Sequence, residues 1–275
     1  MMSGYDLLAR ALAACGREEW TGVLRVSGAP GGALHLRDGL VVAAESPGAP
    51  GPETLLLRSG RVDGEQWAGL VREAGGARWP AAGLIAHGYA GAAQLRVVCV
   101  MALQDAVFAI LAGRVDGCER AEDGAEPHAP VAVGEPPARL LEDAARKLAA
   151  LAALPRPVHP DRERPVPARR SDGPLTALQR ALLDHADGRR TARDLAFRAG
   201  RGVYTVTVEV ARMLGEGLLE CASAPAPIPI RAAPDGIRHR TPPPPAPPPP
   251  QPPTPVDLPR RRPGGFFRLR NGTPK

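Results

Sequence analysis

The residues most able to do chemistry in this sequence are its histidines and cysteines. The four cysteines, Cys15, Cys99, Cys118 and Cys221, lie far apart and form no C-x-x-C pair, and the six histidines stand at no metal-ligand spacing. Zinc binding and thiol redox chemistry both need clustered side chains. The sequence therefore predicts no metal site and no cofactor, and the unpaired cysteines indicate a reducing, cytoplasmic setting.

Two carboxylates, Glu45 and Asp105, lie close to predicted core segments. A carboxylate in such a position either marks a functional site or caps a turn, and we favour a structural role for both. Glycines 28, 31 and 32 join one predicted strand to another, so they create no helix N-terminus that would cradle a phosphate. We predict no catalytic residues and expect the protein not to be an enzyme.

Basic residues become more frequent toward the C-terminus. Residues 1–150 carry 14 Lys and Arg against 18 Asp and Glu, residues 151–222 carry 12 against 9, and residues 223–275 carry 9 against 2. This polarity is expected if an anionic partner binds the C-terminal end. A solvated tail explains it equally well, so both interpretations stay open.

The first 120 residues should position any site on a mixed α/β or α+β scaffold. The apolar spacing predicts an amphipathic helix over residues 5–14 and three strands over residues 23–26, 33–36 and 40–44. Asp38-Gly39 between the last two strands is typical of a tight hairpin turn. We expect a three-stranded meander, to which residues 114–119 could add a strand.

Helices are expected at residues 53–58, 63–74 and 92–111. Asp63 and Gln66 have the spacing of a capping box at the start of the second. The third is apolar on nearly every side, so it should be the central buried helix of the domain. Its most apolar stretch, residues 97–112, is shorter than the roughly 20 residues that span a bilayer, and we expect no membrane partner.

Two connecting segments follow this domain. Residues 121–137 are acidic and interrupted by proline, which indicates a loop, and residues 138–154 form an amphipathic helix. Residues 155–174 mix proline with arginine and aspartate, which favours an interdomain linker without a core.

A second compact unit is predicted at residues 175–222. Helices at 175–185, 191–199 and 203–215 and an extended segment at 218–222 are the outline of a winged helix-turn-helix. Thr191 and Asp194 have N-cap and N3 spacing, and Gly200 and Gly202 mark the end of the second helix. The predicted parts are therefore a domain at 1–120, a loop and helix at 121–154, a linker at 155–174, a winged-helix-like domain at 175–222 and a tail at 223–275.

Residues of this second unit are candidates for binding DNA. Arginines that could contact phosphates surround its second helix: Arg189, Arg190, Arg193, Arg198 and Arg201. Tyr204, Thr205 and Thr207 at the start of the third helix could approach base edges. That helix otherwise offers one arginine and the phosphate-repelling Glu209, which weighs against sequence-specific reading.

The tail at residues 223–275 is predicted to be disordered. Residues 241–255 contain eleven prolines in fifteen positions, which is typical of a solvated polyproline II segment. Candidate phosphate contacts follow at Arg260, Arg261, Arg262, Arg268 and Arg270. Such a segment could bind phosphates or an acidic protein face, or have no partner.

Four strings of the sequence resemble a known group of proteins. The first consists of residues 21–26 leading into 32–46, with the pattern strand, strand, Asp-Gly, strand, Ala-Glu-Ser. The others are residues 52–60 followed by 66–67, residues 102–110, and residues 183–196 with D-G-x-R-T-x-x-D-L-A. Together they resemble transcriptional regulators called MarR-like from high-GC Gram-positive bacteria, whose N-terminal part is similar to the PATAN-type domain. The resemblance implies a PATAN-like α+β domain followed by a winged-helix-like unit.

Two functions remain in competition at this point. The first is a transcriptional regulator that binds duplex DNA through the C-terminal winged helix. The second is a protein-interaction or signalling adaptor that does not bind DNA and docks a partner through its N-terminal domain. A small-molecule sensor or an enzyme is a third, weaker alternative, and the sequence predicts no oligomeric state.

Overall fold

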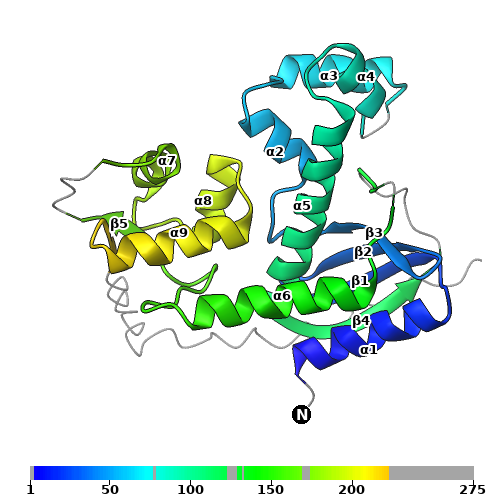
Figure 1. The fold of residues 1–275 in the computed structure, drawn as a ribbon, viewed down its shortest axis with the longest axis horizontal. Coiled ribbons are helices and arrows are strands. Elements are labelled where there is room, and N and C mark those ends of the chain that lie inside the picture. The colour runs from blue at the N-terminus through cyan, green and yellow to red at the C-terminus, as the bar shows by residue number, and fades with distance from the viewer. Residues whose placement is uncertain (1–2, 77–78, 123–128, 132, 169–173, 223–275) are drawn as a thin grey trace, which may run out of the picture. The chain divides into compact units, whose positions relative to one another are not determined.

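The computed structural model describes residues 3–76, 79–122, 129–131, 133–168 and 174–222 (Figure 1). The described residues up to Ala222 belong to one compact unit. The predicted polyproline segment and the candidate tail contacts from Arg260 to Arg270 lie outside the described residues.

The compact unit has a mixed α+β fold built on a four-stranded antiparallel sheet. Its strands are β1 (Gly22–Ala29), β2 (Gly32–Arg37), β3 (Leu40–Glu45) and β4 (Arg114–Ala121), in the order β3-β2-β1-β4. Asp38 and Gly39 have φ angles of 50° and 75°, as a tight β2–β3 turn requires. The predicted meander is confirmed, and β4 is the additional strand that pairs with β1.

Helices α1 (Gly4–Arg17), α5 (Ala92–Ala112) and α6 (Pro137–Ala152) share a hydrophobic core with this sheet. Three shorter helices, α2 (Pro52–Arg58), α3 (Gly64–Glu73) and α4 (Ala81–Ala86), pack around the N-terminal end of α5. The capping box of Asp63 and Gln66 is present at the start of α3. Helix α4 was not expected from the sequence, because six residues around Gly83 carry too weak a helical pattern.

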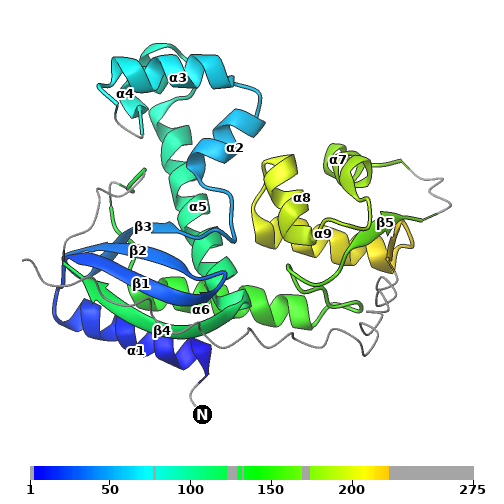
Figure 2. The same cartoon turned by 180° about the vertical axis from the view of Figure 1, so that it is seen from behind.

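Helix α5 is the central element of the unit, and its apolar character on every side has a structural reason (Figure 2). Leu95 joins the core of α2–α4, Leu103 joins the core of the sheet, and Phe108 joins a third core formed with the C-terminal helices. Among the described helices, α5 alone is long and apolar enough to cross a membrane, but 61% of its apolar window is buried inside the protein. The prediction of a central buried helix is confirmed.

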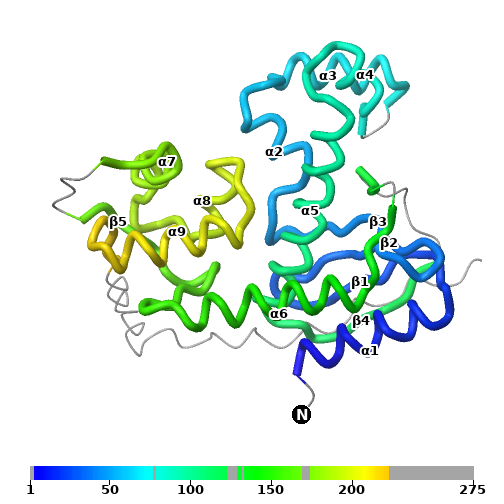
Figure 3. Tube along the Cα trace, in the orientation of Figure 1, coloured from blue at the N-terminus to red at the C-terminus, as the bar shows by residue number. Residues whose placement is uncertain are grey.

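Three helices follow: α7 (Ala177–His185), α8 (Ala192–Ala199) and α9 (Val203–Gly215). A capping box of Thr191 and Asp194 begins α8, as predicted. After α9, strand β6 (Leu219–Cys221) pairs antiparallel with β5 (Pro165–Pro167), which precedes all three helices (Figure 3). Within the described residues, β6 therefore belongs to no hairpin that follows α9.

Residues 155–168, the described N-terminal part of the segment predicted as a linker, pack against the helices instead. Val158 is 5% exposed and belongs to the core of α7–α9, and the carbonyl of Pro160 accepts a hydrogen bond from the Arg193 amide at 3.0 Å. Proline lacks only an N–H, so its carbonyl and ring remain available for packing. We call α7–α9 together with β5 and β6 the C-terminal helical unit.

Candidate functional site

The start of α9 is capped by a side chain from α5. The N-cap residue of α9 is Gly202, which has no side chain that could accept hydrogen bonds from the unpaired backbone amides of the first turn. Asp105 of α5 supplies the acceptor: its Oδ2 accepts from the Val203 amide at 2.6 Å and its Oδ1 from the Tyr204 amide at 3.1 Å. Asp105, expected to be structural, thus joins α5 to a helix 98 residues away.

Asp105 is a buried carboxylate, with 7% of its surface exposed. Burial raises its pKa, because removing a charge from water disfavours the ionised form. The amides of Val203 and Tyr204 and the ammonium group of Lys147 lower the pKa in part, since each stabilises the negative charge. The positive end of the α9 dipole acts in the same sense.

Aromatic packing reinforces this cap. The rings of Phe108 and Tyr204 meet edge to face with centroids 5.4 Å apart, and Nζ of Lys147 lies 5.6 Å from the centre of the Tyr204 ring. Thr207 is fully buried, and its hydroxyl donates to the carbonyl of Val203 at 2.7 Å. Of the three residues predicted to approach bases, only Thr205 is exposed here.

The turn between α8 and α9 allows α2 and α5 to approach closely because it contains two glycines. Gly200 has a φ of 60°, and a methyl group there would overlap the side chain of Arg58. At Gly202 a methyl group would lie 3.2 Å from Oδ1 of Asp105. The sequence identified these glycines only as the end of a helix. In the structure they also allow the turn to pack against α2 and α5.

A groove of about 680 Å³ runs between α2, α5 and this turn. Its lining consists of Leu55, Leu56, Arg58, Ser59, Arg61, Gln94, Val98, Met101, Leu178, Ala199, Gly200, Arg201, Gly202 and Thr205. Three of these residues are arginines and none is acidic. We call this feature the arginine groove.

The groove arginines have few partners within the protein. The Arg61 guanidinium donates to Oε1 of Gln94 at 3.1 Å. Those of Arg58 and Arg201 form no hydrogen bond or ion pair with the residues that the structure describes. Arg58 and Arg61 were missed by sequence reasoning because they come from α2 and the loop after it, more than 130 positions before the turn.

The remaining predicted arginines divide into two groups. Arg193 pairs with Asp161 at 2.7 Å, and Arg190 pairs with Asp187 at 3.0 Å and donates to the His185 carbonyl at 3.0 Å. Arg189 and Arg198 are exposed, like Arg201. The structure therefore brings only Arg201 and Thr205 of the candidate DNA contacts into the groove.

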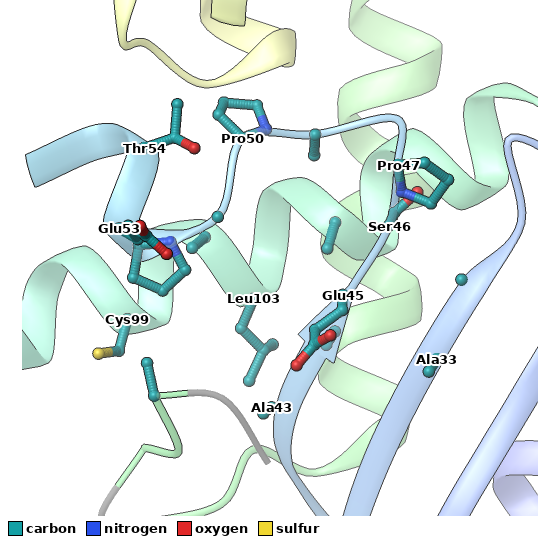
Figure 4. Close-up of a pocket in the computed structure, with 18 residues that line it drawn as sticks. Ala33, Ala43, Glu45, Ser46, Pro47, Pro50, Glu53, Thr54, Cys99 and Leu103 are labelled. Atoms are coloured by element: carbon teal, nitrogen blue, oxygen red, sulfur yellow. The ribbon is translucent and has the colours of Figure 1, made fainter. Parts of the chain in front are cut away.

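A second pocket, of about 450 Å³, lies between β3, the loop after it and α5 (Figure 4). Glu45 and Glu53 contribute carboxylates and Cys99 a thiol, and most other wall positions are alanine, glycine or proline. Burial raises the pKa of Cys99 to about 11, so this sulfur is a neutral thiol at pH 7. Oε1 of Glu45 lies 3.9 Å from Nε2 of His35.

The described residues thus line pockets of contrasting chemistry, one with three arginines and one with two carboxylates and a thiol. No group of three His, Cys, Asp or Glu side chains in this part of the chain could hold a metal ion. The described residues form an α+β fold in which α5 packs against both the sheet and the C-terminal helical unit. No protein-family model, curated protein or solved structure matches this chain.

Proposed function

We propose that this protein is a non-enzymatic regulatory protein that acts by binding a protein partner. The observation that carries the proposal is the docking of α9 on α5. A recognition helix enters the major groove of DNA with its N-terminal residues. Here those residues are capped by Asp105 and packed against Phe108.

The side of α9 that faces solvent also suits a protein better than DNA. It presents Thr205 and Arg212, which are exposed, and the partly buried Glu209. Glu209 accepts from Gln179 of α7 at 2.9 Å, so its carboxylate is fixed on the helix surface. The Glu209 carboxylate would repel phosphate, and Thr205 and Arg212 leave few donors for base edges.

The charge of the compact part supports the same proposal. Residues 1–222 carry 26 Lys and Arg against 27 Asp and Glu, so this part of the chain has no net positive charge that would attract DNA over long range. The resemblance to PATAN-like and MarR-like proteins is compatible with a regulator that binds a protein and with one that binds DNA. The proposal includes a winged-helix-like C-terminal helical unit.

A second candidate function is transcriptional regulation by binding duplex DNA. Arg198 and Arg201 favour it, because both are exposed at the end of α8 and form no ion pair within the described residues. In that case they would contact phosphates, together with the basic tail.

Titration of the full chain with duplex DNA at several salt concentrations separates the two functions. The variants are Arg198→Gln with Arg201→Gln, and the five tail arginines from Arg260 to Arg270 changed together to glutamine. If the protein is an adaptor, any DNA affinity is lost with the tail arginines and the double variant changes neither affinity nor salt slope. A salt slope that falls by about two in the double variant would instead establish DNA binding by the helical unit. Arg139→Gln, on the exposed side of α6, is the matched control.

A further inference from the structure

We propose that the arginine groove binds an acidic, amphipathic segment of a partner protein. This inference rests on the proposed adaptor function and names the surface and the chemistry of the partner. It is carried by two independent features of the groove, its charge and its apolar floor.

The positive charge of the groove favours a ligand that carries carboxylates. Arg58, Arg61 and Arg201 reach it from two parts of the chain, and no acidic residue lies among its lining residues. A guanidinium pairs with a carboxylate through two parallel hydrogen bonds. Arg58 and Arg201 have no such partner within the described residues, so their donors are available to a ligand.

The apolar floor of the groove favours apolar side chains on the same ligand. Leu55, Val98 and Leu178 line it, and Met101 lines it with 50% of its surface exposed. Val97, one turn before Met101 on α5, is 56% exposed and continues this apolar surface. Methionine adapts its shape to different partners, which suits a docking surface.

The combination selects a peptide over DNA. The phosphates of a duplex would pair with the arginines but leave Val97 and Met101 in water. A helical segment covers both features, because apolar residues at positions i, i+4 and i+7 would face the floor while neighbouring glutamates face Arg58, Arg61 and Arg201. The pocket volume of about 680 Å³ has room for a few such side chains.

Fluorescence anisotropy tests the proposal with the full chain and a labelled synthetic peptide. The peptide has about 15 residues, with leucines at i, i+4 and i+7 and glutamates on the flanks. A triple variant, Arg58→Gln, Arg61→Gln and Arg201→Gln, should weaken binding roughly tenfold or more, since each exposed pair contributes modestly. Met101→Ser should weaken it a few-fold, and Arg139→Gln should leave it unchanged.

Two further measurements decide the outcome. A scrambled peptide of the same composition should bind at least several-fold more weakly, because its glutamates and leucines no longer lie on separate faces. Circular dichroism shows whether the triple variant is folded, and Arg61→Gln alone provides a milder change. Equal binding of the peptide by the wild type and a folded triple variant would overturn the proposal.

The same experiment distinguishes the groove from the proposed function. If the triple variant loses affinity for duplex DNA while peptide affinity is absent, the groove is a phosphate site and the inference is wrong. If the peptide does not bind and the DNA titration still excludes the helical unit, the groove proposal fails and the adaptor proposal stands.

Discussion

The sheet region and the C-terminal helical unit are stabilised in different ways. In the sheet, hairpins join β1 to β2 and β2 to β3, β4 pairs with β1, and the core is filled by α1, α5 and α6. The helical unit has short helices, and its core is completed by Ala106, Phe108, Ala109 and Ala112 of α5. A unit of about 50 residues buries little surface by itself. The helical unit therefore depends on α5 for its core, whereas the core of the sheet contains no residue of α7–α9.

The largest effect is expected from removing the ring that joins the two regions. Phe108 is fully buried and contacts Tyr204, so Phe108→Ala should lower the free energy of unfolding by about 3–5 kcal/mol. Chemical denaturation measures this change. Limited proteolysis should also cut residues 155–174 faster than in the wild type, because the helical unit is released. A loss below about 1 kcal/mol with unchanged proteolysis would show that the helical unit is stable without α5.

The close approach at the α8–α9 turn gives the next effect. Gly200→Ala should cost about 2–4 kcal/mol, since a methyl group meets Arg58 and the residue keeps a φ of 60°. Gly217→Ala is the matched control, because Gly217 has a φ of 73° and nothing within 4 Å of an added methyl group. It should cost about 1 kcal/mol. Equal costs for the two variants, measured by denaturation, would mean that the turn does not pack on α2.

A smaller change is expected at Asp105. Asp105→Asn should destabilise the protein at pH 7 by about 1–3 kcal/mol, because the amide group accepts only one of the hydrogen bonds from Val203 and Tyr204. Asp105→Leu, which fills the space without any acceptor, should cost more. An asparagine variant as stable as the wild type would contradict the proposed role of the cap.

The pH dependence of this difference has a defined sign. Because the folded protein raises the pKa of Asp105, it binds the proton more tightly than the unfolded chain. The contribution of Asp105 to stability is therefore fully present below the unfolded value of 3.8 and falls as the pH rises through the raised pKa. Unfolding of the wild type and of Asp105→Asn from pH 3 upward, at about one-unit steps, measures this decline. A stability difference that grows with pH would show that the hydrogen bonds outweigh burial.

The smallest effect concerns thiol reactivity and leaves stability unchanged. Cys221 of the helical unit is exposed, whereas Cys15 and Cys99 are buried and burial raises the pKa of both thiols. At pH 8 a disulfide reagent should modify Cys221 rapidly and the two buried thiols only after unfolding. Mass spectrometry of the labelled chain locates the modified residue, and Cys221→Ser is the control.

Local sequence signals determined most of the elements of this fold. The Asp38-Gly39 turn, the capping box at Asp63 and the helix over residues 203–215 were predicted and are present. These signals involve residues that are neighbours in the chain, so turn chemistry and apolar spacing are sufficient to place them. The all-round apolar character of α5 likewise identified the central helix before its three cores were known.

Tertiary structure alone decided how the C-terminal helical unit is held. The packing of Val158 and the pairing of β5 with β6 involve segments whose local pattern indicates a linker. The roles of Asp105 and Arg58 depend on residues that are 98 or more positions away, and a pattern along one chain does not show which distant segment will meet it. Asp105 could be recognised as a carboxylate beside the core, but its partners, the amides at the start of α9, carry no sequence signature because every residue except proline has one.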